Sequence, residues 1–242
     1  MATPSQEKED TINLNHSKLG TKQYWDDFYT LETNNFKDNK DDTGECWFDD
    51  CDAENRMVQF IMDNDGEQFD IENDKLLDLG TGNGHLLFEL LEEGWNGPLV
   101  GIDYSEVSVR FAENIAKTKD YKDVKFARSD ILNDADSFLV ANEEQFDLVT
   151  DKGTLDAIGL SKEMYGPEGH LKGVDVYPTT VGKLVKTGGV LLITSCNFTE
   201  EELTRIILKN DRFTKWKTIN YPTFQFGGVK GSAICSIAFM KK

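Results

Sequence analysis

One short stretch of this chain constrains its fold more than any other. It consists of an apolar run at 76–79 (LLDL), a glycine-rich turn at 80–84 (GTGNG) and a second apolar run that ends in an acid at 101–103 (GID). Glycine adopts backbone conformations closed to other residues and lets a ligand approach the chain closely. A helix that begins at Gly84 would present free amide groups to that ligand. The stretch therefore predicts the strand–turn–helix–strand unit of an α/β domain that binds an adenosyl group.

The spacing of the glycines separates two classes of cofactor. A dinucleotide fingerprint, G-x-G-x-x-G, requires glycine where this chain has His85. Asp78, which precedes the first glycine, would repel a pyrophosphate but can pair with the ammonium group of S-adenosylmethionine. Asp103 lies 103 − 84 = 19 residues beyond the last glycine, where a carboxylate can accept hydrogen bonds from both ribose hydroxyls. The pattern favours S-adenosylmethionine, and a glycine turn in some other α/β protein is the alternative.

Composition narrows the classes of partner. The 242 residues suit one α/β domain, and the net charge of −18 would repel nucleic acid and attract a basic protein, although such a charge also simply maintains solubility. No apolar run is long enough to cross a bilayer, and the N-terminus lacks a signal-peptide core. Four cysteines form no C-x-x-C pair, so we expect no metal site. We expect a cytoplasmic monomer that binds neither nucleic acid nor membrane.

Short apolar runs alternate with helical patterns along most of the chain. The runs predict strands at 75–79, 98–102, 124–127, 146–150 and 190–194, with helices at 84–93, 105–119, about 137–142, 176–184 and 199–210. Two further strands, 212–219 and 233–240, have no helix between them and should pair antiparallel. We therefore predict an α/β, Rossmann-like, seven-stranded, mostly parallel sheet with a C-terminal antiparallel hairpin and helices on both faces.

The N-terminal quarter is predicted to be an addition to this core. Residues 1–17 are polar and are expected to form a disordered tail, with a single domain over 18–242. Within it, residues 18–74 are expected to form a helical extension and a lid over the cofactor or substrate. A helix is predicted over 18–32 and a polar loop over 34–43, and Asp52 is expected to cap a second helix.

Taken together, the motifs resemble those of the class I, seven-β-strand methyltransferases, and more closely the family that methylates lysine in translation elongation factor 1-alpha. The likeness is carried by LGTK at 19–22, DTGECWF at 42–48, the glycine turn and DKGTLDA at 151–157. The glycine turn indicates only the superfamily, whereas the D-K-G-T motif is narrower and recurs in an enzyme that also modifies this factor's N-terminal amine. Three alternatives stay open: a methyltransferase acting on a protein N-terminus, one acting on a small molecule, or a non-catalytic S-adenosylmethionine-binding scaffold.

The resemblance implies a role for individual residues in binding S-adenosylmethionine. Asp78 and the glycine turn would hold the methionine end of the cofactor. Asp103 would bind its ribose and Asp130 its adenine. The aromatic Trp47 would cover the site or line its entrance. The implied cofactor-binding residues are Trp47, Asp78, Gly80, Thr81, Gly82, Asp103, Tyr104, Asp130, Ile131 and Asp151.

Methyl transfer to lysine requires an amine without its proton, although the ordinary lysine pKa is near 10.4. We expect Asp151 to position the incoming amine through its side chain or its adjacent backbone, with Asp156 as a second candidate that alternatively supports the turn. Lys152 would repel a sulfonium, so it is expected in an ion pair with Asp156, and Thr154 is expected to cap the next helix. Loop regions that could contact the substrate are Tyr165, Pro178 and 224–228.

Overall fold

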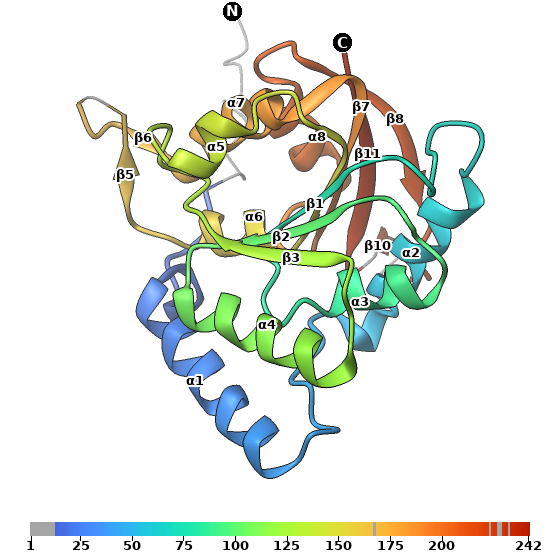
Figure 1. Ribbon diagram of the computed structural model, residues 1–242. Coiled ribbons are helices and arrows are strands. Elements are labelled where there is room, and N and C mark those ends of the chain that lie inside the picture. The colour runs from blue at the N-terminus through green and yellow to red at the C-terminus, as the bar shows by residue number, and fades with distance from the viewer. Residues whose placement is uncertain (1–12, 167, 223, 227–228, 232) are drawn as a thin grey trace, which may run out of the picture.

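A seven-stranded sheet forms the centre of the computed structural model, which describes residues 13–166, 168–222, 224–226, 229–231 and 233–242. The strand order is β3-β2-β1-β4-β7-β11-β8 (Figure 1). The first five strands in this order run parallel, and β11 is antiparallel to both β7 and β8, which confirms the predicted sheet. Their bounds are β1 (Leu76–Leu79), β2 (Leu99–Asp103), β3 (Val124–Arg128), β4 (Phe146–Lys152), β7 (Val185–Ser195), β8 (Phe213–Ile219) and β11 (Cys235–Lys241).

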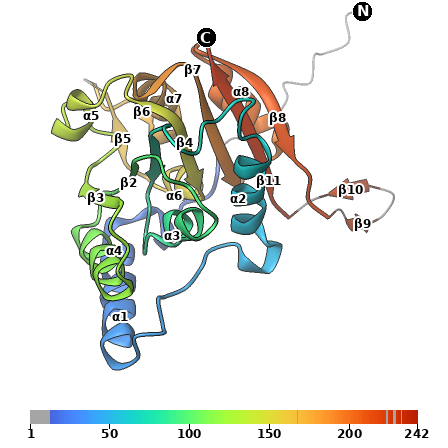
Figure 2. The same ribbon diagram turned by 45° about the vertical axis from the view of Figure 1, so that its right-hand side comes forward.

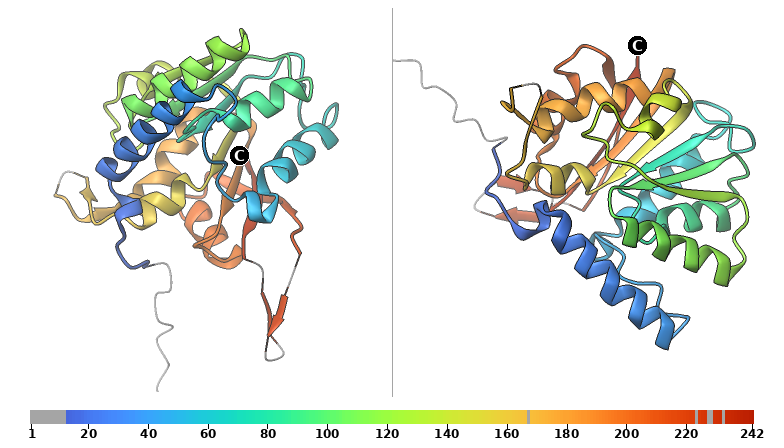
Figure 3. Two further views of the ribbon diagram at one scale, coloured as in Figure 1. Left: turned by 90° about the horizontal axis from the view of Figure 1, so that it is seen from below. Right: turned by 60° about the vertical axis from the view of Figure 1, so that its left-hand side comes forward.

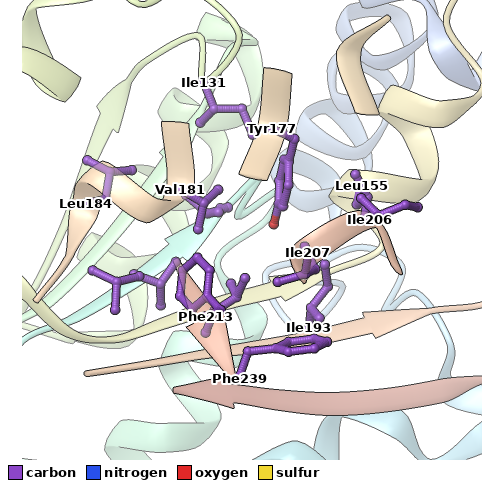
Figure 4. Close-up of a cluster of buried hydrophobic side chains, with 14 of the residues drawn as sticks. Ile131, Leu155, Tyr177, Val181, Leu184, Ile193, Ile206, Ile207, Phe213 and Phe239 are labelled. Atoms are coloured by element: carbon purple, nitrogen blue, oxygen red, sulfur yellow. The ribbon is translucent and has the colours of Figure 1, made fainter. Parts of the chain in front are cut away.

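Helices cover both faces of the sheet because the strands are apolar on both sides. Leu76 belongs to one buried cluster and its neighbour Leu77 to the other, as the alternation of side chains along a strand requires. One face carries α1 (Lys22–Asp38), α2 (Ala53–Asp63), α3 (His85–Glu92) and α4 (Glu106–Lys119). The other carries α5 (Ser137–Ala141), α6 (Thr154–Gly159), α7 (Gly173–Leu184) and α8 (Glu200–Leu208), whose cluster Figure 4 shows.

The register of the parallel strands brings the predicted acids to one edge of the sheet. Asp78 is opposite Gly101 on one side and Thr150 on the other, and Leu79 is opposite Asp151. Parallel strands end at the same edge, and ligands of open α/β sheets bind outside that edge. The topology therefore assembles one site from the ends of β1, β2 and β4.

The N-terminal helix differs from the prediction at both ends. A short 3-10 turn, η1 (Lys18–Gly20), precedes α1, and α1 continues to Asp38 through much of the expected loop. It continues because Phe36 is 2% exposed and packs edge-on against the Phe111 ring of α4, at 5.8 Å between centroids. Figure 3 shows α1 lying beside α4.

Residues 13–17, which were expected to belong to a disordered tail, instead contact the folded domain. Leu14 packs against the core, and the Ser17 amide donates a hydrogen bond to the Leu160 carbonyl at 3.2 Å. These contacts tie the chain to the end of α6. Residues 1–12, where the rest of the tail was expected, lie outside the described residues.

The start of α2 also departs from the expected helix cap. Asp52 stands at the cap position after a short turn, η2 (Asp49–Cys51), but its φ of 55° is left-handed and its side chain accepts no cap hydrogen bond from the backbone. Its carboxylate instead accepts from the Asn55 side chain at 2.7 Å. The prediction that Asp52 stands at the cap position is confirmed, but its carboxylate contacts the Asn55 side chain and no backbone amide of the helix.

Two small antiparallel hairpins were not predicted. They pair β5 (Met164–Tyr165) with β6 (Leu171–Lys172), and β9 (Phe224–Phe226) with β10 (Val229–Gly231). Figure 2 shows β9 and β10 standing away from the large sheet. Pro178, expected on a loop, is buried inside α7, and residues 227–228 lie outside the described part of the chain. Among the described residues, no helix has the length and apolar character needed to cross a membrane.

Candidate active site

A cavity of about 290 Å³ lies at the carboxyl edge of the sheet. Its walls come from the ends of the parallel strands, α1, the start of α2, and the segment between these two helices. All but one of the predicted site residues line it: Trp47, Asp78, Gly80, Thr81, Gly82, Asp103, Tyr104, Asp130, Ile131 and Asp156. The fold thus gathers residues that are far apart in sequence around one space.

Glycine at the first turn position is required by close packing as well as by backbone conformation. Gly80 has a φ of +61°, and a Cβ there would lie 2.1 Å from the Thr154 hydroxyl oxygen. That hydroxyl donates to the Leu79 carbonyl at 2.7 Å, so Thr154 holds the turn and does not cap α6 as predicted. Gly153 occupies the cap position of α6. The first turn of α6 and the glycine turn are therefore built as one unit.

The two acids that the glycine motif indicated are both buried at the cavity wall. The Asp103 carboxylate accepts hydrogen bonds from the Gly82 amide at 3.1 Å and the Ser105 amide at 2.9 Å. Asp78 accepts from the Thr150 hydroxyl at 2.8 Å. Burial raises the pKa of Asp103, and it raises the pKa of Asp78 to about 6. A cationic ligand group would favour the ionised form of Asp78.

Asp151 does not line the cavity, which corrects the expected position of its side chain. It is fully buried, and its carboxylate accepts from the Thr154 amide at 2.9 Å, the Leu155 amide at 3.1 Å and the Tyr177 hydroxyl at 2.6 Å. Burial raises its pKa to about 7. Asp151 therefore anchors the start of α6 to α7.

Asp156 lines the cavity but is also held firmly by neighbouring groups. Its carboxylate accepts from the Ser195 hydroxyl at 2.5 Å, the Cys196 amide at 2.9 Å and the Asn197 amide at 3.3 Å. These contacts join α6 to the end of β7. The geometry agrees with the alternative that the sequence left open, in which Asp156 supports the turn.

Lys152 has partners other than the expected Asp156. Its ammonium donates to the Trp47 carbonyl at 3.1 Å and lies 3.3 Å from a carboxylate oxygen of Glu54. The other Glu54 oxygen lies 2.5 Å from Nδ1 of His85. Burial acts to raise the Glu54 pKa, but the contacts with His85 and Lys152 outweigh it and lower that pKa. Hydrogen bonding to Glu54 raises the pKa of His85.

Sequence reasoning missed this cluster, although one signal was present. Glu54 lies three residues before Met57 and seven before Ile61, so it falls on the buried face of α2. Cys46, Glu54 and His85 also place ligand-type atoms within 4.8 Å of one another. Because Lys152 and His85 already flank the Glu54 carboxylate with positive charge or donors, the cluster is best described as a buried ion-pair network.

Residues 42–48, called the strap from here on, lie in the connection between α1 and α2 and line the cavity with Glu45, Trp47 and Phe48. The Asn83 side chain donates to the carbonyls of Thr43 and Glu45 at 3.1 and 3.2 Å, and the Glu45 amide donates to Glu32 at 3.1 Å. Trp47 packs edge-on against Trp25, at 5.2 Å between centroids. The strap contributes Trp47 to the cavity wall, where the sequence expected it.

Acidic side chains outnumber basic ones around the cavity. The acidic lining residues are Glu45, Glu54, Asp78, Asp103, Asp130, Asp156 and Glu163, whereas the basic ones are Lys22, His85 and Lys152. Of these bases, Lys22 is paired with Asp26 at 2.6 Å and Lys152 with Glu54. Such a lining favours a cationic ligand over an anionic one.

Comparison with known proteins identifies the family. A family model described as a methyltransferase domain matches residues 70–228. The chain belongs to this methyltransferase family. The methyltransferase is 50% identical over 233 residues to protein-lysine N-methyltransferase EFM4 of Saccharomyces cerevisiae, covering 96% of this chain and 98% of that protein. It is 32% identical to EEF1A lysine methyltransferase 2 of Homo sapiens, covering 93% and 87% of the two chains.

Solved structures support the same fold. Magnesium protoporphyrin IX methyltransferase from Synechocystis, solved with bound SAM, superimposes with a TM-score of 0.55 at 16% identity and covers 89% of this chain and 98% of that one. A TehB-like SAM-dependent methyltransferase from Corynebacterium glutamicum gives 0.56 at 14% identity and covers 90% and 98%. At these identities the likeness shows a shared fold.

The cavity of this methyltransferase fits S-adenosylmethionine, its cofactor. The glycine turn leaves the space that a Cβ would fill, and the buried acids line the same space, which suits a ligand that carries an ammonium and ribose hydroxyls. Among the described residues, the indole Nε1 of Trp47 is buried and has no hydrogen-bond partner, so it is available to a polar ligand atom. The chemistry of the lining therefore agrees with the family.

Proposed function

We propose that this methyltransferase transfers a methyl group to a lysine side chain of translation elongation factor 1-alpha. The observation that carries the proposal is a match over almost the whole chain to relatives named protein-lysine N-methyltransferase and EEF1A lysine methyltransferase. The acidic lining of the cavity agrees with a substrate whose reactive side chain is a cation in solution.

We propose that the cofactor is held by the residues that line the glycine turn and the strand ends. Asp78 would pair with its ammonium, Asp103 with its ribose hydroxyls, and Asp130 with its adenine, beside Tyr104 and Ile131. The cofactor supplies a methyl group activated by attachment to a sulfonium. The protein's part is to bind, orient and exclude water.

The lysine amine must reach the methyl group without its proton. A partly apolar wall desolvates the ammonium and lowers its pKa, whereas a nearby carboxylate raises that pKa while it orients the amine. We assign the orienting role to the backbone after Asp151, because the carboxylate itself is occupied by Thr154, Leu155 and Tyr177. We propose that Asp156 supports that backbone through its contacts with Ser195, at the end of β7, and with the Cys196 amide.

We propose that the protein substrate approaches along the β5–β6 hairpin. Glu163 and Tyr165 line the cavity where it meets this hairpin, and Tyr165 pairs across it with Leu171. Leu171 is 46% exposed and Met164 on the paired strand 47%, so the hairpin presents two large apolar side chains to solvent. The hairpin lies at the side of the molecule, away from the C-terminal strands (Figure 1).

A second function is kept because the D-K-G-T motif also occurs in an enzyme that modifies an N-terminal amine. An acceptor amine of either kind would enter the same acidic cavity. A scaffold without catalysis is disfavoured because the acids at 78 and 103 and the glycine turn are complete. We further propose that the enzyme works in the cytoplasm as a monomer and binds neither nucleic acid nor membrane, in keeping with its charge of −18.

The proposal is tested by incubating the purified protein with labelled S-adenosylmethionine and methyl-depleted elongation factor 1-alpha, followed by mass spectrometry. We expect label on a lysine, lost in the Asp78→Ala variant. Label on the N-terminal amine would favour the second function. Cofactor binding without label in either place would overturn both acceptors while leaving the methyltransferase family intact.

A further inference from the structure

Lys152 makes contacts that the methyl-transfer reaction does not call for. It ends β4, lines the cavity, and its side chain is only 14% exposed. Its ammonium contacts two elements at once, the Trp47 carbonyl of the strap and the Glu54 carboxylate of α2. A long cationic side chain is held so deeply only when its charge is paired and its donors are used.

A direct part in the chemistry does not explain this position. An ammonium repels both the sulfonium of the cofactor and the charged form of a substrate lysine. The Glu54 carboxylate offsets that repulsion, since its two oxygens lie 3.3 Å from Lys152 and 2.5 Å from His85. Glu54 thus neutralises the charge of Lys152 beside the site. We therefore look for the role of Lys152 in the group to which it donates a hydrogen bond, the Trp47 carbonyl.

What Lys152 holds is the far end of the strap. The near end is tied by Asn83, which binds the Thr43 and Glu45 carbonyls. Trp47, at the far end, packs on Trp25 and offers its carbonyl to Lys152. The strap also contains two left-handed residues, Gly44 with φ 91° and Phe48 with φ 69°. A left-handed phenylalanine is an uncommon conformation that needs support from its surroundings.

We propose that Lys152 is a positioning residue that fastens the strap over the bound cofactor and thereby sets how slowly the cofactor and its demethylated product leave. Glu54 fixes the ammonium where it can reach the Trp47 carbonyl. The inference rests on the cofactor and does not depend on which acceptor the enzyme methylates.

The test measures the dissociation rate of S-adenosylhomocysteine by stopped-flow tryptophan fluorescence in the full-length protein. We expect Lys152→Met to release this probe at least about tenfold faster, because a hydrogen bond from a charged donor to the strap is lost. The KM for S-adenosylmethionine should rise in parallel. The matched control is Lys186→Met, since Lys186 pairs with Asp147 at 2.7 Å and does not line the cavity.

A double variant separates fastening from simple destabilisation. Lys152→Met alone leaves Glu54 without its ammonium partner, whereas Lys152→Met with Glu54→Gln removes that unpaired charge and keeps an oxygen for His85. If Lys152 fastens the strap, the double variant still releases the probe about tenfold faster than the wild type, because the Trp47 carbonyl stays unbound. Release at the wild-type rate in the double variant would show a structural role only and overturn the proposal.

Hydrogen exchange provides a reading that does not depend on any variant. In the wild-type protein, S-adenosylhomocysteine should slow the exchange of backbone amides in residues 42–48. Unchanged exchange there, despite saturation by the probe, would mean that the strap does not close over the ligand and would also overturn the proposal.

Discussion

The two sides of the cavity are built by different kinds of contact. On the side of the strand ends, the paired strands β1, β2 and β4 place Asp78 and Asp103 at the cavity wall. On the strap side, Trp47 is held by Lys152, which lies 105 residues further along the chain. The first side is carried by the backbone pairing of the parallel sheet, whereas the strap is held by side chains of other elements. We infer that the acids at the strand ends supply most of the cofactor affinity and that the strap slows cofactor dissociation.

The largest expected effect is a loss of cofactor affinity when an acid at the strand ends is removed. Asp103→Ala removes the expected ribose acceptor and also frees the Gly82 and Ser105 amides that shape the turn. We expect the affinity for S-adenosylhomocysteine, measured by calorimetry, to fall roughly 100-fold. Asp134→Ala, at an exposed position outside the cavity lining, should bind normally. Similar losses of affinity in both variants would show that Asp103 does not contribute specifically to cofactor binding.

A second prediction separates structural from chemical use of Asp151. Asp151→Ala should lower the free energy of unfolding in urea by ~3 kcal/mol, because it leaves two backbone amides and the Tyr177 hydroxyl without an acceptor. Asp151→Asn should keep most of the stability, since its amide oxygen can still accept. If the alanine variant has normal stability but no turnover, the Asp151 carboxylate takes part in the reaction and its structural role is contradicted.

The third prediction concerns pH. The Asp78 pKa is raised to about 6 by burial, so below that pH a proton competes with the ligand ammonium. Cofactor affinity should fall about tenfold from pH 7 to pH 5. Because the folded-state pKa lies above the unfolded value, the same group stabilises the unliganded protein at low pH, and this contribution is lost as the pH rises through about 6. Asp78→Asn should weaken both dependences, with a remaining slope in stability from Asp151, whose pKa burial raises to about 7. An unchanged pH dependence of cofactor affinity in that variant would contradict the role of Asp78.

The smallest predicted effect concerns the protein substrate. Leu171→Asp on the β5–β6 hairpin should raise the KM for the elongation factor about fivefold, with the KM for S-adenosylmethionine unchanged. Val140→Asp is the matched control, because Val140 is 61% exposed on α5 and does not line the cavity. Equal KM values for the two variants would mean that the substrate docks elsewhere.

Local patterns in the sequence predicted the parts of the site that local structure builds. The acids at 78 and 103 follow apolar runs, and in the fold they lie at the carboxyl ends of β1 and β2, beside the cavity. The partners of Lys152 could not be predicted, because Glu54 and Trp47 are placed by the packing of α2 and the strap. The lengthening of α1 escaped prediction for the same reason, since Phe36 is buried by tertiary packing that includes Phe111 of α4.

The sequence alone determined the α/β class, the mostly parallel sheet and the turn that approaches the cofactor, because strand periodicity and glycine conformation are local properties. Tertiary structure alone decided the direction of side chains at the site. The buried Asp151 carboxylate accepts a hydrogen bond from Tyr177 and does not line the cavity. Because α2 packs near the end of β4, Lys152 contacts both Glu54 and the Trp47 carbonyl of the strap. Those outcomes depend on which distant groups need a partner once water is excluded, and no local pattern contains that information.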